Sequence, residues 1–350
     1  MTATFLEQAR KLCGHETWHK QAWKRFEAIG LPNKANEVFR YVRLRAFFER
    51  PIELEESRIP SVPTGVIAIT LSKAWHTYGA FLEKRLAIWL KQEKDPFALL
   101  NAALEHEGVF LYVPPNTKIE KPLQINTPRL IVYVARGAEL SIVGNIGFCD
   151  FAIEENASAT IQREITHFQT LRATLKRDAT FKSIAFASSA KQPSARLTIA
   201  RDDYHVQLQG EGSNATLVGL SRLDGKQECH TNVLMEHIAP HTTSSQKFKG
   251  VIDDFVRSTF EGKIYVHPQA QKTQAYQMNN YLILSPKAEA KSKPNLEIFA
   301  DDVKASHGAT TGQLDEDALF YLLTRGIPKE EAKQLLIAAF CREVINEAIG

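Results

Sequence analysis

The sequence predicts a mainly β protein whose core is a parallel β-helix, a solenoid of stacked coils, held between two helical regions. Three observations carry this prediction. A stretch of roughly 190 residues before Ala300 reads as short strands and turns. The segments on either side of it show helical spacing of apolar residues. Within the β stretch, a short pattern recurs at intervals of about 20 residues, which is typical of coils that stack and share one core.

Residues 1–106 are predicted to be a mostly helical N-terminal domain. Apolar residues from Phe5 to Leu12 follow helical spacing, and a second apolar stripe from Trp18 ends at Gly30. Helical spacing returns from Tyr78 to His106, with a break near Asp95-Pro96. We interpret the many aromatic residues of this domain as core.

Residues 107–303 are predicted to be the parallel β-helix. The recurring pattern is a small, a polar and an apolar residue after a turn-type residue: Ala138-Glu139-Leu140, Ala159-Thr160-Ile161, Ala179-Thr180-Phe181, Ala195-Arg196-Leu197 and Ala215-Thr216-Leu217. The first residues lie 21, 20, 16 and 20 positions apart. A sandwich or jelly roll is the alternative, because its turns also recur at short intervals. Only one hairpin-type dipeptide, Asp224-Gly225, supports that alternative.

Residues 304–350 are predicted to be a C-terminal helical domain of two helices. Asp315 is placed to cap the first helix, Gly326 to end it, and Pro328 to begin the second. The stretch from Leu335 to Cys341 is apolar on every side of a helix. Such a helix needs cover on both sides, so it either binds a partner or is buried in its own domain.

Composition restricts the class of protein. Lys and Arg number 43 and Asp and Glu 40, for a net charge of +3, which gives no basic surface for a nucleic acid. No apolar run is long enough to span a membrane, and the first residues do not resemble a secretion signal. The four cysteines, Cys13, Cys149, Cys229 and Cys341, are far apart and form no CxxC pair. We therefore expect free thiols in a reducing cytoplasm.

One histidine stands out at the boundary between the β and helical regions. His307 follows Asp301-Asp302 and precedes a turn-forming Gly-Ala-Thr-Thr-Gly segment. A histidine in such a position is a plausible metal ligand or acid–base group, although a hydrogen-bonded structural role is the commoner one.

The last third of the chain resembles the SufB/SufD family of iron–sulfur cluster assembly proteins. The matching segments are His237-x-x-Pro240-His241, Lys249-Gly250-Val251, Phe260-x-Gly262-Lys263-Ile264-x-Val266, Ala270-x-x-Thr273-x-Ala275-x-Gln277, Lys293-Pro294-x-Leu296-Glu297-Ile298, Asp301-Asp302-Val303-Lys304, Ser306-His307-Gly308-Ala309-Thr310, Gly312-Gln313-Leu314-Asp315, Leu319-Phe320-Tyr321-Leu322 and Arg325-Gly326-Ile327. So many matches in order are more specific than any single motif. The N-terminal half resembles the family more loosely.

The resemblance implies a right-handed parallel β-helix and a non-catalytic scaffold subunit. It implies pairing with the SufB paralogue through the β-helix and docking of the SufC ATPase on the C-terminal helices. The chain has no phosphate-binding Gly-x-x-x-x-Gly-Lys-Ser/Thr loop, so ATP hydrolysis is expected in SufC. A homodimer is possible when the chain is alone. The residues expected to bind the ATPase are Leu319, Tyr321, Leu322, Leu335, Leu336 and Phe340.

By the same resemblance, His307 is a candidate ligand for iron or a nascent cluster at the SufB interface. Asp301, Asp302 or a backbone carbonyl is expected to orient its imidazole. Family members often carry a cysteine two residues before this histidine, where this chain has Ala305. A stable cluster usually needs four protein ligands, so we expect only transient binding, completed by a SufB thiolate.

Other candidate residues are given structural roles. Cys149 and Cys229 are expected to be inert core thiols, and His237 and His241 lie on strand or turn, where four residues span about 13 Å. A β-helical carbohydrate-active enzyme is the rival function, with Asp202-Asp203 and Asp253-Asp254 as its acidic pairs. Adjacent strand residues point to opposite faces, so neither doublet forms a convergent pair.

Overall fold

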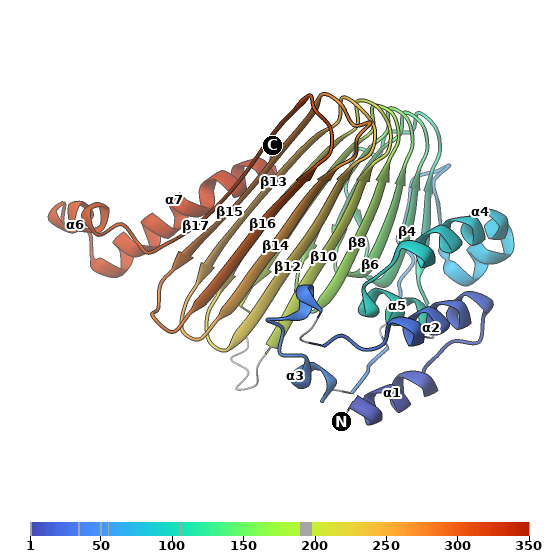
Figure 1. Ribbon diagram of the computed structural model, residues 1–350, viewed down its shortest axis with the longest axis horizontal. Coiled ribbons are helices and arrows are strands. Elements are labelled where there is room, and N and C mark those ends of the chain that lie inside the picture. The colour runs from blue at the N-terminus through green and yellow to red at the C-terminus, as the bar shows by residue number, and fades with distance from the viewer. Residues whose placement is uncertain are drawn as a thin grey trace.

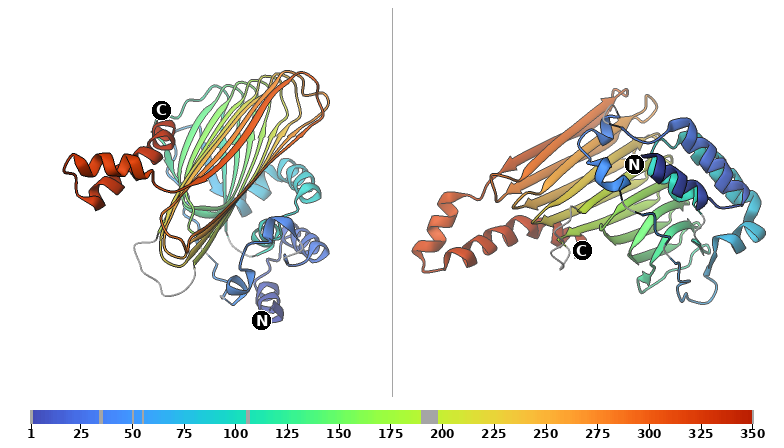
Figure 2. Two further views of the ribbon diagram at one scale, coloured as in Figure 1. Left: turned by 60° about the vertical axis from the view of Figure 1, so that its left-hand side comes forward. Right: turned by 90° about the horizontal axis from the view of Figure 1, so that it is seen from below.

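The chain forms two stacked, mostly parallel sheets with helices at both ends (Figure 1). The computed structural model describes residues 2–33, 36–49, 51–54, 56–104, 107–189 and 198–349. The N-terminal helices lie beside the early strands, and the two C-terminal helices project from the opposite end (Figures 1 and 2). None of the helices described is both long and apolar enough to cross a membrane.

The N-terminal region is largely helical, as predicted. Its elements are α1 (Thr2–Lys11), α2 (Thr17–Ile29), the 3₁₀ helix η1 (Glu37–Phe39), α3 (Leu44–Phe48), β1 (Ile67–Thr70), α4 (Leu71–Gln92) and α5 (Pro96–Ala103). The predicted break is the start of α5, where the Asp95 carboxylate accepts a hydrogen bond from Phe97 N at 2.8 Å. Strand β1 was not predicted, because its four residues are too few to show a period.

From β2 onward, successive strands alternate between the two sheets. One sheet contains β1, β2 (Val109–Val113), β4 (Thr127–Val134), β6 (Ile146–Ile153), β8 (Phe168–Leu175), β10 (Thr198–Leu208), β12 (Gln227–His237), β14 (Arg257–Val266) and β16 (Glu289–Ile298). The other contains β3 (Leu123–Gln124), β5 (Glu139–Gly144), β7 (Ser158–Glu164), β9 (Thr180–Ser188), β11 (Asn214–Leu223), β13 (Thr243–Ile252), β15 (Thr273–Ile283) and β17 (Val303–Gly312).

Parallel pairing decides between the predicted architectures. Among the named strands, β1 with β2 is the antiparallel pair, and every other ladder is parallel. The prediction of a mainly β core with parallel sheets and flanking helices is confirmed. The sandwich or jelly roll alternative is wrong, because those folds are built from antiparallel strands.

The main core lies between the two sheets. Side chains from alternate positions of each strand, such as Leu130, Val132 and Val134 on β4, are fully buried there. A second core joins the N-terminal helices to the outer face of the first sheet, where Phe47 stacks on Phe168 with ring centroids 4.4 Å apart.

The recurring sequence pattern marks inward positions, but two of its members are out of step. Pairing aligns Leu140 with Ala159, Ala159 with Phe181, and Phe181 with Ala215. The triplets that begin at Ala159 and Ala215 are therefore displaced by two residues from the others. Because the side-chain period of a strand is two, the displaced residues still face the core. The triplet that begins at Ala195 lies outside the described residues.

The repeat also lengthens along the chain. Thr127 pairs with Ile146 in an early coil, and Thr198 pairs with Gln227 in a later one, so the offset grows from about 20 to about 30 residues. The interval seen in the sequence thus belongs to the early strand pairs alone.

The C-terminal helices are α6 (Glu316–Thr324) and α7 (Lys329–Ile349). The predicted cap is present, since the Asp315 carboxylate accepts a hydrogen bond from Ala318 N at 2.9 Å. The predicted boundary at residue 304 falls inside β17, so strand pairing continues to Gly312 before the helices begin.

Candidate functional site

The two sheets end at β16 and β17, which have no further strand beside them in the described part of the chain. Strand β17 pairs with β15 on one side, and its residues are mostly exposed, whereas alternate residues of β15 are buried. The inner faces of the last two strands are therefore open. An uncovered edge presents unpaired backbone N–H and C=O groups, so this end of the molecule is suited to pairing with another chain.

His307 lies in the middle of β17 at this open end. It pairs in parallel register with Gln277 of β15, which is 2% exposed and belongs to the inward-facing set. Ala305, two residues earlier, packs against the main core. Paired residues of parallel strands share a face, so His307 also belongs to the inward-facing set. It is exposed because β17 is the last strand of its sheet in the described part of the chain.

The opposite wall of the open end is β16. Its Ser292 donates a hydrogen bond to the side-chain oxygen of Asn279 on β15. The amide nitrogen of Asn279 donates to the Phe248 carbonyl at 3.3 Å. The interior beneath His307 is thus polar as well as apolar, and its polar groups are ordered by contacts between the sheets.

The predicted orienting carboxylates of His307 are in the wrong place. Asp302 lies just before β17, five residues from His307, which corresponds to about 16 Å along a strand. Its backbone N donates to the Gln271 side chain at 2.9 Å at the far turn. Neither Asp301 nor Asp302 can therefore reach the imidazole.

Within the described residues, no three or more His, Cys, Asp or Glu side chains are grouped to hold a metal ion. At the open end, Ala305 occupies the position where a thiol would share the inner face with His307. The chain therefore presents a single imidazole there, and a cluster would require ligands from elsewhere.

His237 and His241 have the structural roles expected of them. His237 is fully buried, and its two ring nitrogens lie 2.7 Å from Thr242 Oγ1 and 2.8 Å from Ser244 Oγ. Burial lowers the pKa of His237 to about 3, which keeps the ring neutral. His241 occupies a turn with a φ of 58°.

Cys149 and Cys229 are buried in the β region. Burial raises the pKa of each thiol to about 12. A protonated thiol is a poor nucleophile and a poor metal ligand, so both behave as core residues in the described fold.

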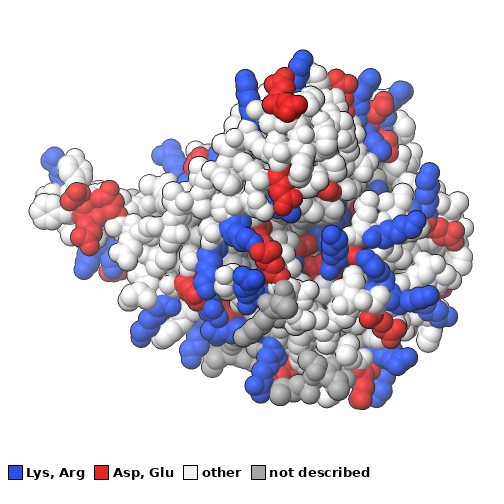
Figure 3. Space-filling model, viewed as in Figure 1, with Lys and Arg blue, Asp and Glu red and all other residues white. Residues whose placement is uncertain are grey.

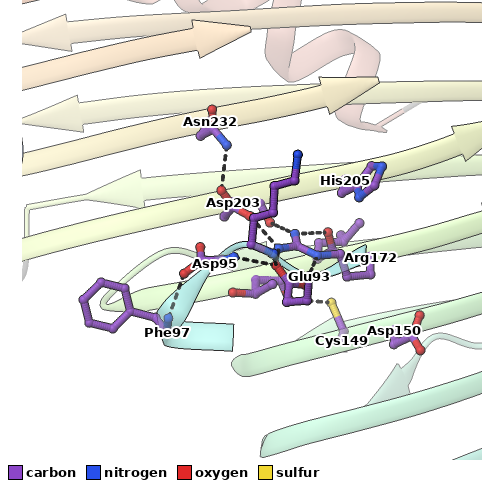
Figure 4. Close-up of polar contacts among 12 residues, drawn as sticks. Glu93, Asp95, Phe97, Cys149, Asp150, Arg172, Asp203, His205 and Asn232 are labelled. Carbon is purple, nitrogen blue, oxygen red and sulfur yellow. Dashed lines mark hydrogen bonds and ion pairs between the residues drawn. The ribbon is translucent and has the colours of Figure 1, made fainter. Parts of the chain in front are cut away.

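A buried ion-pair network joins the turn before α5 to the first sheet (Figure 4). Arg172 donates to the Glu93 carboxylate at 2.8 and 2.9 Å and lies 2.7 Å from Asp203. Asp203 also accepts from Arg201 at 2.6 Å and from Asn232 at 2.7 Å. Burial alone lowers the Arg172 pKa, but Glu93 and Asp203 outweigh it and the pKa lies above its usual value. These charges are mutually satisfied, which indicates a structural clamp.

The acidic doublets of the rival enzyme do not form a catalytic pair. Asp202 is buried and accepts two hydrogen bonds from Arg163 at 3.0 Å, while Asp203 belongs to the network just described. Asp253 and Asp254 lie at a turn after β13. A cavity of about 190 Å³ between α4 and the first sheet is lined by charged residues, but Arg85 is already paired with Asp150 there.

The predicted partner-binding residues on the C-terminal helices fall into an exposed group and a half-buried group. Tyr321 and Leu335 are exposed, at 57% and 47%, and α6 buries none of its residues. Leu319, Leu322 and Leu336 are half-buried.

Phe340, also half-buried, packs toward the chain's own sheet, with Lys249 Nζ 4.8 Å from its ring centroid. Ile337 and Cys341 are buried against Val251 and Leu282. The apolar helix is therefore covered by its own domain on one side and open on the other. On α6, Phe320 is exposed at 66%, and it was not among the predicted partner-binding residues.

Surface charge indicates no polyanion site on the face seen in Figure 3. Positive and negative side chains are interspersed there, without a field of one sign. This agrees with the net charge of +3.

Comparison with known families gives two matches. A family model described as "SUF system FeS cluster assembly, SufBD core domain" matches residues 118–340, and one described as "SufBD protein N-terminal region" matches residues 53–125. The first match alone covers more than half of the chain and includes both sheets beyond the first strands.

Three relatives illustrate the similarity. An iron–sulfur cluster assembly SufBD family protein of Synechocystis is 29% identical over 316 residues, which cover 79% of this chain and 68% of the relative. The cluster assembly protein SufD of Escherichia coli is 37% identical over 183 residues, or 52% of this chain and 41% of the relative. SufD of Bacillus subtilis is 27% identical over 314 residues, or 81% and 70%.

Proposed function

The chain belongs to the SufBD family of iron–sulfur cluster assembly proteins, and from this premise we propose that it is a SufD-like, non-catalytic scaffold subunit. In this proposal it pairs with a SufB paralogue and with the SufC ATPase. His307 supplies one imidazole ligand to iron or to a nascent cluster at the SufB interface. The observation that carries the proposal is the position of His307 on the inner face of an uncovered end strand.

We infer that the two sheets together form a right-handed parallel β-helix. The alternation of strands between the sheets supports one coil for each pair of strands. Connections between parallel strands of one sheet are right-handed in nearly all proteins, which supports the handedness. In this proposal residues 1–106 cover the β-helix, the β-helix runs from residue 107 through β17, and α6 and α7 form the docking region.

The open end supports pairing with a second β-helix. The edges of β16 and β17 offer backbone donors and acceptors, and a partner's end strands would complete both sheets. A neutral imidazole is a suitable iron ligand. Because Ala305 carries no thiol, the remaining ligands must come from the partner, and the cluster is transient cargo at the interface.

The test is the cluster content of a complex copurified with SufB and SufC. We expect His307→Ala to lower the iron and sulfide content and the visible absorbance several-fold while leaving the complex intact. His76→Ala is the matched control, since His76 is an exposed histidine on α4 at the other end of the molecule. Unchanged cluster content in His307→Ala would refute the assignment.

A further inference from the structure

We propose that Gln277 is a positioning residue for His307. When the exposed His307 ring turns toward it, the side-chain oxygen of Gln277 accepts a hydrogen bond from one ring nitrogen, which leaves the other nitrogen unprotonated and free to bind a metal. This inference rests on the proposed function, because it explains how a lone imidazole is kept in a ligand-competent form.

Register places three polar side chains in one inward-facing column. Gln246 of β13 pairs with Gln277 of β15, and Gln277 pairs with His307 of β17. Neighbouring strands lie about 4.8 Å apart, so each side chain is within reach of the next. Gln246 and Gln277 are 1% and 2% exposed, and His307 ends the column at the open side.

One hydrogen bond directs the Gln277 amide in this structure. Its Nε2 donates to Gln246 Oε1 at 2.8 Å. Its Oε1 is buried and accepts no hydrogen bond in this structure, from His307 or from any other described residue, and Gln246 Nε2 is likewise buried without a partner. A buried acceptor without a partner costs roughly 1–3 kcal/mol, so a donor is expected. The next side chain in the column is His307, whose ring is exposed and can turn to donate to this oxygen.

The opposite sheet confines the same amide. A Cβ built on Gly262 of β14 would lie 2.4 Å from Gln277 Nε2, so the amide reaches across the interior to a position that only glycine leaves open. The amide is thus held by Gln246 and by the backbone at Gly262. A side chain held at both points keeps its Oε1 directed toward the next strand, β17.

The chemical consequence concerns the tautomer of His307. A carboxamide oxygen only accepts, so the ring nitrogen that faces it must carry the proton. In a neutral imidazole the second nitrogen then holds the lone pair that binds a metal. Fixing the ring and its tautomer through the other nitrogen is the usual function of a residue behind a histidine ligand.

The experiment reads the tautomer directly in the full-length chain, without partners or metal. Histidine is labelled with ¹⁵N, and ring nitrogens are observed by NMR at a pH of about 9, well above the ordinary histidine pKa of about 6.5. The His307 signals are identified by their absence in His307→Ala. In the wild type we expect two widely separated nitrogen signals, which indicate a single tautomer. In Gln277→Leu we expect them to converge, as both tautomers become populated.

Two further variants keep the test decisive. Gln246→Leu leaves Gln277 in place but frees its amide to turn over, so it should also make the signals converge, even if Gln277→Leu folds poorly. Gln274→Leu is the matched control, because Gln274 is an exposed residue of the same strand, and its spectrum should equal the wild type. Converged signals in the wild type, or separated signals in both column variants, would overturn the proposal.

The outcomes separate this inference from the proposed function. If His307→Ala lowers the cluster content but the spectra of the column variants are unchanged, His307 is a ligand and Gln277 does not position it. If the spectra change as expected but His307→Ala leaves the cluster content intact, the hydrogen bond is real and the ligand assignment falls.

Discussion

The polar residues of this protein are of two kinds: those whose side chains are hydrogen-bonded within the fold, and those whose side chains remain open to solvent. His237 has a hydroxyl oxygen beside each ring nitrogen, and Asp202 has a guanidinium on both carboxylate oxygens. Such groups are bound to the core and have no capacity left for chemistry. His307 differs because it lies at the end of a column, with one neighbour below it and open space above.

His237 should make the fold sensitive to acid. Its pKa is about 3 in the folded chain against an ordinary 6.5, so below pH 6.5 the unfolded chain binds a proton that the folded chain does not. Stability is therefore lost as pH falls from 6.5 toward 3, by up to about 1.4 kcal/mol per pH unit. We expect His237→Gln to lose less melting temperature than the wild type between pH 7 and pH 5, as measured by calorimetry.

Comparing how melting temperature changes with pH in the two proteins separates this effect from any loss of stability that the substitution causes at every pH. His19, whose pKa burial lowers to about 4, remains in both proteins and contributes equally to each. Parallel acid dependence in the two proteins would show that His237 is not the group responsible.

At the scale of elements, the ion-pair network determines how the helical cover is attached. Glu93 lies in the turn between α4 and α5 and binds Arg172 of β8 with both carboxylate oxygens. It also accepts hydrogen bonds from the backbone N of Lys94 and Asp95 at 3.0 and 2.8 Å. One side chain therefore holds the turn and ties it to the sheet.

Glu93→Ala should destabilise the protein strongly. The substitution leaves the buried Arg172 guanidinium with part of its charge uncompensated, a change that typically costs about 3–5 kcal/mol. Denaturant-induced unfolding followed by circular dichroism measures the loss. Glu49→Ala removes an exposed pair with Arg45 and should change stability by only about 0.5 kcal/mol. Equal effects of the two substitutions would contradict the clamp.

At the scale of the whole molecule, two surfaces lie at the same end. The two sheets end at β16 and β17, and α7 packs on the outer face of the second sheet close by, where Lys249 Nζ lies 2.7 Å from Glu343. Helix α6 extends away from the body (Figure 1). A partner bound to α6 would therefore lie at the end of the molecule that carries His307.

The exposed aromatic residues of α6 are expected to hold the ATPase. We predict that Phe320→Asp together with Tyr321→Asp weakens binding to SufC by at least tenfold, because exposed aromatic anchors often carry 2 kcal/mol or more of an interface. Binding of the purified chain to SufC by calorimetry measures this. Asp317→Asn on the same helix is the control, and undiminished affinity in the double variant would place the docking surface elsewhere.

The sequence by itself determined the classes of structure and the family. Local signals suffice for these, since caps such as Asp315 act within one helical turn and alternation within a strand shows which residues face inward. The family resemblance likewise depends on residues in order along the chain. The same signals nominated His307, whose ligand role stays a prediction.

Only the tertiary structure decided which residues meet. Parallel pairing joins residues about 20 to 30 positions apart, and no local pattern encodes those offsets, so the recurring triplets were read two residues out of step. The column of Gln246, Gln277 and His307 exists only through that pairing. For the same reason the sequence suggested Asp302 as the partner of His307. Residues five positions apart on one strand lie about 16 Å apart, whereas paired residues on neighbouring strands lie only about 4.8 Å apart.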